Sequence, residues 1–275
     1  MKHKFLLIFL VYTSFTSTKA QNLFDSTNTE KYANYLFVNQ EYILAKEEFE
    51  RLIFLKVNLS DTIYYKHLKS LRLSGETGKA YLTISTLDTN KIFESKLLSK
   101  EYFTILIKNK NYHLVPQISK KSVTLSENEK IFYEVSASLY AENFKKSEEL
   151  IMLYPDNELL TPYKDVLQER KKIRYKNPYV SSSLSAIIPG LGQTYSGNWK
   201  DGIITLLFTG SSAYQSYRGF TKYGANSLYG WIFGAVATGF YVGNIYGAAK
   251  ASNKYNFLKN IKISLQIETI FDNYN

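Results

Sequence analysis

The sequence contains no cysteine, three histidines and five prolines in 275 residues. Without cysteine, the chain cannot form disulfides, thiolate metal sites, iron–sulfur clusters or a lipoprotein-type cysteine anchor. The histidines are His3, His67 and His113, and we expect the last two at exposed helix positions. Such scattered imidazoles favour neither a catalytic base nor a metal site. We therefore predict no catalytic, cofactor-binding or metal-binding residues, and we do not expect an enzyme.

Phosphate-binding and nucleic-acid-binding motifs are also missing. Residues Gly75 to Ala80 lack the upstream glycine spacing of a phosphate loop and the Ser or Thr after its lysine, so we interpret them as a turn between helices. The glycines at 190, 192 and 197 do not form a dinucleotide-binding loop. The net charge of +10 is spread over the chain. Solvated helix faces and juxtamembrane clusters explain it without a nucleic-acid partner.

The first twenty residues have the pattern of a secretory signal peptide. Lys2 and Lys4 form a basic start, residues 5–12 are apolar, and Thr18-Lys19-Ala20 is a small-x-small cleavage site. An uncleaved anchor or a buried N-terminal helix is the alternative, but eight apolar residues are too few for a span of about 20 residues. We predict that residues 1–20 are removed and that Gln21 becomes the N-terminus.

Residues 21–176 form the second predicted segment, in which apolar residues recur at helical spacing and period-two alternation is missing. Two helices are expected on either side of a turn at Asn39-Gln40, and a similar set follows thirty-five residues later. Small alanines at each crossing allow close helix packing. The first set comprises Ala33, Leu36, Phe37, Tyr42, Ala45 and Phe49, and the second comprises Leu68, Leu71, Gly75, Ala80 and Ile84.

This offset resembles the tetratricopeptide repeat, a helix–turn–helix unit of about 34 residues. The resemblance extends over residues 29–155, and its later, less regular members are Leu106, Tyr112, Ile118, Tyr133, Ala137, Phe144, Ser147 and Ile151. It implies stacked hairpins with a concave surface for an extended partner. A generic helical bundle, in which the aromatic residues only fill the core, is the alternative. A last helix is expected from Thr161-Pro162 to the basic residues 170–176.

Residues 177–250 have the composition of a membrane domain. Three stretches without charge cover residues 177–199, 202–217 and 223–249, of 23, 16 and 27 residues. The third is long enough to span a bilayer, and the second is marginal. Pro189 interrupts the first, which fits a short interfacial or re-entrant segment. We predict two transmembrane helices, with a third crossing as the alternative.

Glycine spacing in the third stretch predicts close helix packing. The partner is either the 203–217 helix of the same chain or a second copy of the protein, so a homo-oligomer is a possible consequence. The glycines of this pattern are Gly230, Gly234, Gly239, Gly243 and Gly247.

The most distinctive local pattern precedes these helices. It consists of Pro189, Gly190, Leu191, Gly192, Gln193, Tyr195 and Gly197. This run resembles the Pro-Gly-Leu-Gly-Gln-x-Tyr-x-Gly signature of a family of uncharacterised bacterial membrane domains that follow exported helical repeats, and it is distantly similar to a family of small domains with two transmembrane helices. A tight turn explains the glycines. Alternatively, Gln193 and Tyr195 present polar groups at the membrane surface to lipid headgroups or a partner.

The C-terminal tail, residues 251–275, alternates Ile261, Ile263, Leu265 and Ile267 with polar residues. This favours a strand, with an amphipathic helix as the alternative. Export of the N-terminal domain and a two-crossing hairpin would leave the tail outside. The basic residues near 170–176 and Lys250 would then lie outside as well, which the positive-inside tendency disfavours.

Taken together, these patterns predict an all-α protein in which a helical-hairpin repeat domain is followed by a transmembrane helical hairpin. We expect an envelope protein held in the lipid bilayer, with its N-terminal domain exported and periplasmic in a two-membrane envelope. The expected role is to bind an unidentified envelope protein as a scaffold or adaptor. The alternative is a membrane module that self-associates into a larger assembly or a small transport component.

Overall fold

The computed structural model describes residues 25–55 and 59–275, which contain helices and no strand. The all-helical class is therefore confirmed, whereas the predicted signal peptide lies outside the described residues. The chain divides into two compact units. The first contains the described residues up to Ala141 together with Asn275, and the second is Glu142–Tyr274. The expected boundary at residues 176 and 177 falls inside the second unit.

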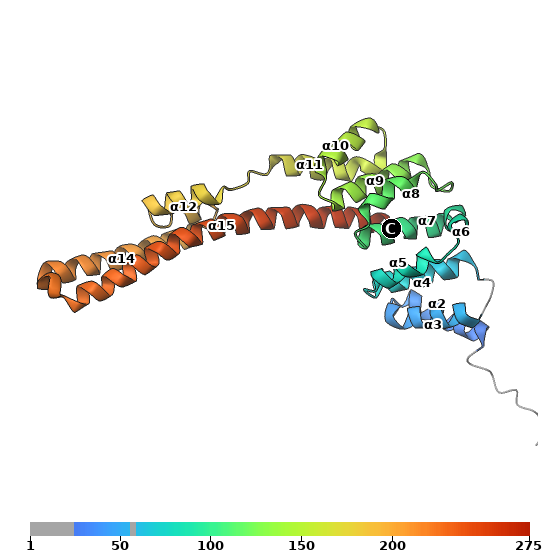
Figure 1. Ribbon diagram of the computed structural model, residues 1–275, viewed down its shortest axis with the longest axis horizontal. Coiled ribbons are helices and arrows are strands. Elements are labelled where there is room, and N and C mark those ends of the chain that lie inside the picture. Colours follow the sequence, from blue (N-terminus) through green and yellow to red (C-terminus); the bar gives the residue numbers. More distant parts are fainter. Residues whose placement is uncertain (1–24, 56–58) are drawn as a thin grey trace, which may run out of the picture. The chain divides into compact units, whose positions relative to one another are not determined.

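The first unit is a series of helices joined by short turns (Figure 1). The α2, α4 and α7 helices begin at residues 26, 61 and 96, so consecutive starts are 35 residues apart (61 − 26 and 96 − 61). The elements are α2 (Ser26–Val38), α3 (Tyr42–Leu55), α4 (Asp61–Leu73), α5 (Thr77–Ser85), α6 (Thr89–Glu94), α7 (Lys96–Lys108), η1 (Tyr112–Leu114), α8 (Val115–Ser119) and α9 (Glu127–Tyr140).

Helices α2 and α3 form the first predicted hairpin. The side chain of Asp25 caps α2 by accepting a hydrogen bond of 2.7 Å from the backbone N–H of Asn28. Gln40 turns the chain with φ of 62°. Ala33 and Ala45 are fully buried, and they belong to a core cluster that also contains Leu36, Phe49, Leu52, Leu59 and Ile63. The predicted crossing of two small alanines is confirmed.

The second hairpin, α4 and α5, follows the same plan. Gly75 adopts φ of 90° in the turn between the helices, a backbone conformation in which a side chain would be strained. Residues 75–80 therefore form the expected turn and the start of α5. Its core consists of Leu68, Leu71, Ala80, Ile84, Ile92, Phe93, Leu98 and Ile105. Lys79 on α5 forms an ion pair of 3.0 Å with Glu50 on α3, which links the two hairpins.

The helices that follow, α6 to α9, are less regular than the first two hairpins. A six-residue helix, α6, precedes α7, and α8 is only five residues long. Asp88 caps α6 with a hydrogen bond of 3.0 Å to the backbone N–H of Asn90, so this extra turn has its own start signal. The α9 helix begins with a capping box, in which the side chains of Ser126 and Glu129 each accept from the other residue's backbone N–H.

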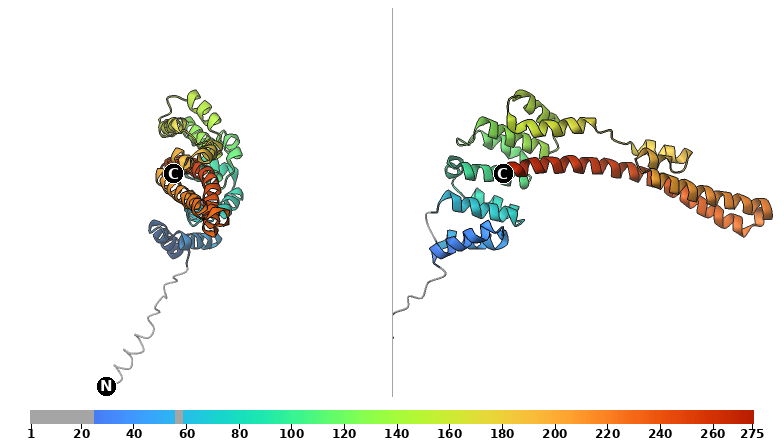
Figure 2. Two further views of the ribbon diagram at one scale, coloured as in Figure 1. Left: turned by 90° about the vertical axis from the view of Figure 1, so that its left-hand side faces the viewer. Right: turned by 180° about the vertical axis from the view of Figure 1, so that it is seen from behind.

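The second unit contains a long antiparallel helical hairpin, in which α14 lies beside the first half of α15 (Figures 1 and 2). α11 packs against the later part of α15, where Lys262 forms an ion pair of 2.5 Å with Glu169. The elements are α10 (Phe144–Leu153), η2 (Glu158–Leu160), α11 (Thr161–Lys172), α12 (Pro178–Ile187), α13 (Leu191–Tyr195), α14 (Trp199–Tyr223), η3 (Gly224–Asn226) and α15 (Leu228–Tyr274).

Two local expectations about this unit need correction. The expected N-cap Thr161 is instead the first residue of α11, because η2 runs directly into the helix and Leu160 takes the cap position. The strand expected in the tail is wrong, since α15 continues to Tyr274. Ile263, Ile267 and Phe271 are buried at a spacing of four residues, and this helical period prevails over the alternation of two.

Candidate functional site at the glycine-rich loop

Helix α12 is delimited by signals in its own sequence. The side chain of Asn177 caps it by accepting a hydrogen bond of 2.9 Å from the N–H of Tyr179, and Pro178 occupies the first turn, where its missing N–H is not needed. The helix ends at Ile187, before Pro189, as expected. Gly190 then adopts φ of 88° and starts the single turn of α13.

The glycines of this loop are required by close backbone packing. A Cβ atom on Gly190 would lie 2.0 Å from the carbonyl oxygen of Gly202 at the start of α14. A Cβ atom on Gly192 would lie 2.0 Å from the carbonyl oxygen of Ser181 on α12. Both distances are far below any contact between real atoms, so α13 fits between α12 and α14 only without these side chains.

A buried set of uncharged polar side chains ties α12, α13 and α15 together; we call it the polar core. The Ser185 hydroxyl accepts a 3.0 Å hydrogen bond from the N–H of Gly192 and donates one of 3.0 Å to the side-chain oxygen of Gln193. Each member has at most 6% of its surface exposed. The members are Ser181, Ser185, Gln193, Ser196, Asn244 and Ser252.

Asn244 on α15 completes this network. Its side chain accepts a hydrogen bond of 2.9 Å from the N–H of Gly190 and donates one of 2.9 Å to the carbonyl of Ser185. The backbone carbonyl of Asn244 accepts a hydrogen bond of 3.2 Å from the side-chain amide of Gln193. The hydroxyls of Ser196 and Ser252 lie 2.8 Å apart. Because these groups are mutually satisfied, the polar core holds the helices in register and leaves no reactive group exposed.

Gln193 is therefore placed differently from the surface position expected for it. It is 6% exposed and belongs to the polar core, where its amide accepts from the Ser185 hydroxyl and donates to the carbonyl of Asn244 on α15. Tyr195 is half-buried, and its hydroxyl accepts a hydrogen bond of 3.4 Å from the N–H of Asn177. Leu191 is 37% exposed, and Gly197 turns the chain with φ of 89°.

The segment that leads into α12 is also fixed to α15. The backbone N–H and carbonyl of Lys176 each form a hydrogen bond of 2.8 Å with the side chain of Asn256. The ammonium of Lys176 lies 4.6 Å from the centre of the Tyr195 ring, a cation–π distance. The hydroxyl of Tyr175 donates to Asn260 over 2.6 Å. These contacts join residues 175–176, which connect α11 to α12, to α13 and α15.

The five predicted packing glycines fall into two groups. Gly230 lies against Gly219 of α14, where a Cβ atom on Gly219 would come within 2.7 Å of the Gly230 backbone. A Cβ atom on Gly234 would lie 3.0 Å from the Ser216 hydroxyl oxygen. In contrast, within the described part of the chain nothing lies within 4 Å of a Cβ atom on Gly239 or Gly243, and a Cβ atom on Gly247 would meet only the Gln193 amide, at 3.6 Å. The chain's own α14 therefore occupies only the first part of the glycine face.

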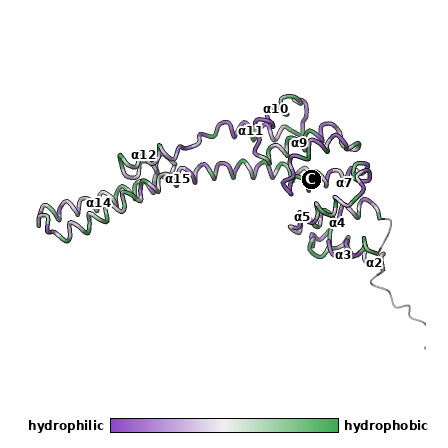
Figure 3. Tube along the Cα trace, viewed as in Figure 1, coloured by the Kyte–Doolittle hydropathy of each residue, from purple (hydrophilic) through white to green (hydrophobic). Residues whose placement is uncertain are grey.

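The hairpin buries small residues and exposes large apolar ones. The buried residues of α14 are Gly202, Thr209, Ser212, Ser216 and Gly219. Its exposed apolar residues include Ile203 at 48%, Leu207 at 64% and Phe208 at 55%. Hydrophobic residues recur along both α14 and the adjacent part of α15 (Figure 3). By length and composition α15 is able to cross a membrane, and it is the only described helix that meets both criteria.

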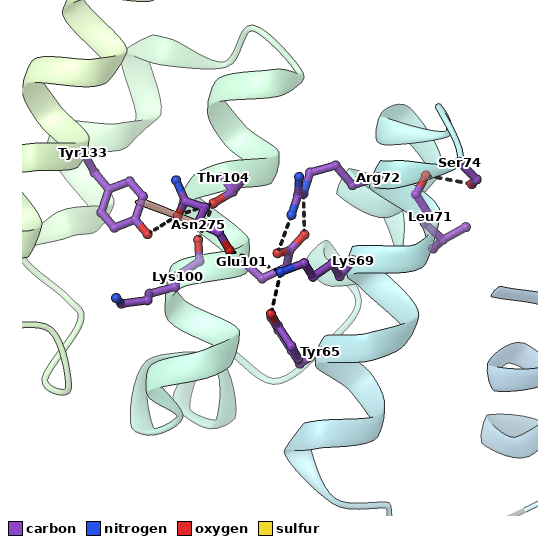
Figure 4. Close-up of polar contacts among 10 residues, drawn as sticks. All are labelled: Tyr65, Lys69, Leu71, Arg72, Ser74, Lys100, Glu101, Thr104, Tyr133 and Asn275. Atoms are coloured by element: carbon purple, nitrogen blue, oxygen red, sulfur yellow. Dashed lines mark hydrogen bonds and ion pairs between the residues drawn. The ribbon is translucent and has the colours of Figure 1, made fainter. Parts of the chain in front are cut away.

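In the first unit the strongest buried polar feature is an ion pair. The guanidinium of Arg72 on α4 donates two hydrogen bonds, of 2.6 and 3.0 Å, to the carboxylate of Glu101 on α7 (Figure 4). Burial raises the pKa of Glu101, and Arg72 opposes that shift. The pair is 9% and 2% exposed, so it cross-links two helices away from solvent.

His67 on α4 is also buried, and its predicted exposed position is wrong. Only 3% of it is exposed, and neither ring nitrogen has a hydrogen-bond partner among the residues that the structure describes. Burial lowers its pKa from 6.5 to about 4, so the imidazole is neutral at physiological pH. His113 is exposed in η1, as expected.

Glu129 has a different environment from Glu101. Although burial raises its pKa, the N–H of Ser126 and the ion pairs with Lys96 and Lys100 lower it to about 2. No cluster of three His, Cys, Asp or Glu residues suited to a metal ion occurs in residues 25–55 and 59–275.

Comparisons with protein-family models, with curated proteins and with solved structures found no match for this chain. The functional argument therefore rests on the geometry alone. The motif residues of the loop were identifiable from their spacing in the sequence. Asn244 and Ser252 were not, since nothing near them in the sequence marks them as partners of a loop some fifty residues earlier.

Proposed function

We propose that the protein is a membrane-anchored scaffold or adaptor, in which the hairpin of α14 and α15 inserts into a lipid bilayer and the helical domain before it binds another envelope protein. The inverted packing of the hairpin carries the proposal. In water, exposed Leu207 and Phe208 would be unfavourable, whereas in lipid the same side chains lie in their preferred medium. Buried small and hydroxyl residues are typical of helix packing inside membranes.

The lengths of the two helices fit this role. The uncharged part of α15, residues 228–249, extends over about 33 Å at 1.5 Å per residue. The whole of α14, with charged residues near both ends, extends over about 37 Å, and its uncharged part, residues 202–217, over about 24 Å, so it crosses with those charged residues near the interfaces or in a thinned bilayer. A hydrocarbon core is about 30 Å thick. Trp199 at one end of α14, and Tyr223 and Trp231 at the other end of the hairpin, are exposed aromatic residues suited to the two interfaces.

Topology follows from the signal-like N-terminus. If residues 1–20 direct export, the helical domain lies outside the cytoplasm and periplasmic in a two-membrane envelope. A hairpin with two crossings then places its tip, residues 223–228, on the opposite side. The α12 and α13 helices, at the base of the hairpin, lie at the outer interface. Arg218 and Lys222 near the tip agree with the positive-inside tendency. The basic residues at the other end of the hairpin, near 170–176 and at Lys250, do not.

The helical domain offers a surface for a protein partner. The helices α2, α4 and α7 begin 35 residues apart, which is the spacing of a stacked repeat. Three apolar side chains on one side of α2 are exposed, namely Tyr32 at 49%, Tyr35 at 64% and Val38 at 75%. Their spacing of three residues makes them neighbours on the helix, and an exposed apolar group of this kind is suited to a binding surface. We infer no catalytic role for either part.

Site-directed labelling tests the topology directly, because the chain has no cysteine of its own. Single variants K145C, A213C and N226C of the full-length protein would be exposed to a membrane-impermeant maleimide in intact spheroplasts, in spheroplasts permeabilised with the bilayer retained, and after solubilisation in detergent. We expect labelling of K145C in intact spheroplasts, of N226C only after permeabilisation, and of A213C only in detergent. Labelling of both K145C and N226C in intact spheroplasts would overturn the two-crossing hairpin.

The partner surface is tested by cross-linking the full-length protein in its native membrane. We expect Y35S/V38S to lose a cross-linked complex that the wild-type protein forms. The control is L82S, which removes an apolar side chain of α5 that is 67% exposed and should leave the complex intact. Equal loss in both variants would indicate a general effect of apolar surface.

Self-association is the second candidate function, and the open part of the glycine face favours it. Among residues 25–55 and 59–275, nothing lies within 4 Å of a Cβ atom on Gly239 or Gly243, so a second α15 is able to approach there. Replacing both by Leu should then convert an oligomer into a monomer in detergent, as measured by sedimentation. A wild-type protein that is monomeric at all concentrations would eliminate this candidate.

A further inference from the structure

The tip of the hairpin contains a groove that the anchoring role does not require. It has a volume of about 350 Å³ and lies between the last turns of α14 and the first turn of α15. Its residues are Gln215, Arg218, Gly219, Lys222, Tyr223 and Tyr229. At Gly219 the backbones of the two helices meet with no room for a side chain, since a Cβ atom there would lie 2.7 Å from the Gly230 backbone.

The groove is positively charged, and no carboxylate of the described chain compensates it. Arg218 and Lys222 are one helical turn apart, so their charges repel each other. No Asp or Glu occurs between Asp201 and Glu268. Lys222 also complements the negative end of α14, but Arg218 is too far from that end to do so. Two cations held together without a counter-ion favour an anionic ligand.

The uncharged residues of the groove supply further donors. The hydroxyl of Tyr229 donates a hydrogen bond of 2.9 Å to the side-chain oxygen of Gln215. This bond engages the oxygen of the amide, so the NH₂ group of Gln215 remains the donor for a ligand. Lys222 lies 5.1 Å from the centre of the Tyr223 ring. A guanidinium, an ammonium and an amide NH₂ all donate, and a phosphate group is an acceptor for all three.

We propose that this groove binds a phosphate group, supplied by the headgroup of an anionic phospholipid. The lipid source rests on the proposed function, because a hairpin with two crossings brings the groove to the far interface, where headgroups are present at high local concentration. The volume lies near the lower end of the range of about 300–1,000 Å³ for small-molecule sites, which suits a headgroup. Aromatic residues beside the groove, Tyr223 and Tyr229, are suited to the same depth.

Native mass spectrometry of the full-length protein in detergent, titrated with phosphatidylglycerol or phosphatidylcholine, tests the proposal. We expect tighter binding of phosphatidylglycerol, because the choline cation would be repelled by Arg218 and Lys222. The variant R218Q/K222Q should bind phosphatidylglycerol at least ten-fold more weakly. The matched control is K250Q/K254Q, which removes the same charge at the same spacing from exposed positions at the other end of the hairpin, and it should stay within two-fold of wild type.

The remaining arms separate the sources and the two proposals. Inorganic phosphate that displaces the lipid, with the same dependence on Arg218 and Lys222, would assign the groove to free phosphate. Equal losses in both double variants, or no preference between the lipids, would overturn the site in favour of general charge attraction. Carbonate extraction of membranes is measured in parallel. Release of the wild-type protein by carbonate would refute the membrane anchor. The measurements of phosphate binding in detergent would still show whether the groove binds a phosphate group.

Discussion

The two halves of the molecule bury opposite kinds of side chain. Helix α4 of the first unit buries Ile63, Leu68 and Leu71, whereas α14 of the hairpin buries Gly202, Ser212 and Ser216 and exposes its isoleucines and leucines. In the first unit, water drives apolar residues inward. In the hairpin there is no such gradient if lipid surrounds it, so close backbone approach and hydrogen bonds decide which face is inside.

The buried polar groups differ in the same way. The first unit buries a charged pair, Arg72 with Glu101, between α4 and α7. The polar core of the hairpin contains only Ser, Asn and Gln, and each hydrogen bond there joins neutral groups. A neutral network needs no compensating charge when its surroundings are apolar. If the hairpin lies in lipid, as proposed, the surrounding medium selects what each helix buries as much as the helical period does.

The largest effect is expected from breaking the ion pair of the first unit. Arg72→Met leaves Glu101 buried without its partner and should reduce local stability by about 3–5 kcal/mol. The opening free energies of α4 and α7, measured by hydrogen exchange of the full-length protein, report it. The double variant R72M/E101L should recover to within about 1 kcal/mol of wild type, since an apolar pair replaces the charges. A double variant as unstable as the single would contradict this explanation.

The next effect belongs to the hairpin. Gly192→Ala places a methyl group 2.0 Å from the Ser181 carbonyl and should destabilise the α12–α13 contact by about 3 kcal/mol. Faster exchange of the α13 amides would show it. Gly239→Ala is the matched control, because no atom of the described residues lies within 4 Å of the added Cβ, and it should be neutral or stabilising by up to about 1 kcal/mol. Similar damage from both changes would mean that these glycines serve flexibility and not packing.

A pH effect should separate the two regions. The folded pKa of His67 is about 4 against 6.5 when unfolded, so the stability linked to its neutral form is complete above pH 6.5 and declines as the pH falls toward 4. At pH 5 the loss around α4 should be about 2 kcal/mol. His67→Leu should remove this dependence. The α12 and α13 helices have no titratable group in their polar core, and a parallel loss there would contradict the assignment to His67.

The smallest effect is expected at the start of α9. Ser126→Ala removes one half of the capping box and should cost about 1 kcal/mol, measured as faster exchange in the first turn of α9. Because Glu129 has a folded pKa of about 2, the cap should remain intact above the carboxylate's usual range and weaken only as the pH falls below it. Unchanged exchange in S126A would show that the lysines alone hold Glu129 in place.

Local patterns were sufficient for much of the helical domain. Alanines at the crossing of α2 and α3, and the turn at Gly75, follow from spacing and backbone preference over fewer than twenty residues. The extra helix α6 was missed because a six-residue helix has too few turns to show a period. His67 was misplaced because a single polar residue on an apolar face gives no sign of its burial.

The hairpin shows the same division. Glycine spacing predicted close packing, but it did not distinguish Gly230, which meets Gly219, from Gly239, which meets nothing. Likewise, the loop motif predicted a tight turn, whereas the inward position of Gln193 depends on Asn244, more than fifty residues later. Pairings between distant segments leave no trace in a local pattern, since either partner alone has several ways to satisfy its hydrogen bonds.

By itself, the sequence determined the helical class, the small-residue crossings, the uncharged stretches and the lack of cysteine chemistry. These depend on properties that each residue has wherever it lies, namely polarity, size and backbone freedom. The tertiary structure decided which of the glycines pack against another helix and where the polar core forms. It also brought Arg218, Lys222 and Tyr229 to one groove. Those outcomes depend on two helices meeting at one register, which only the folded chain specifies.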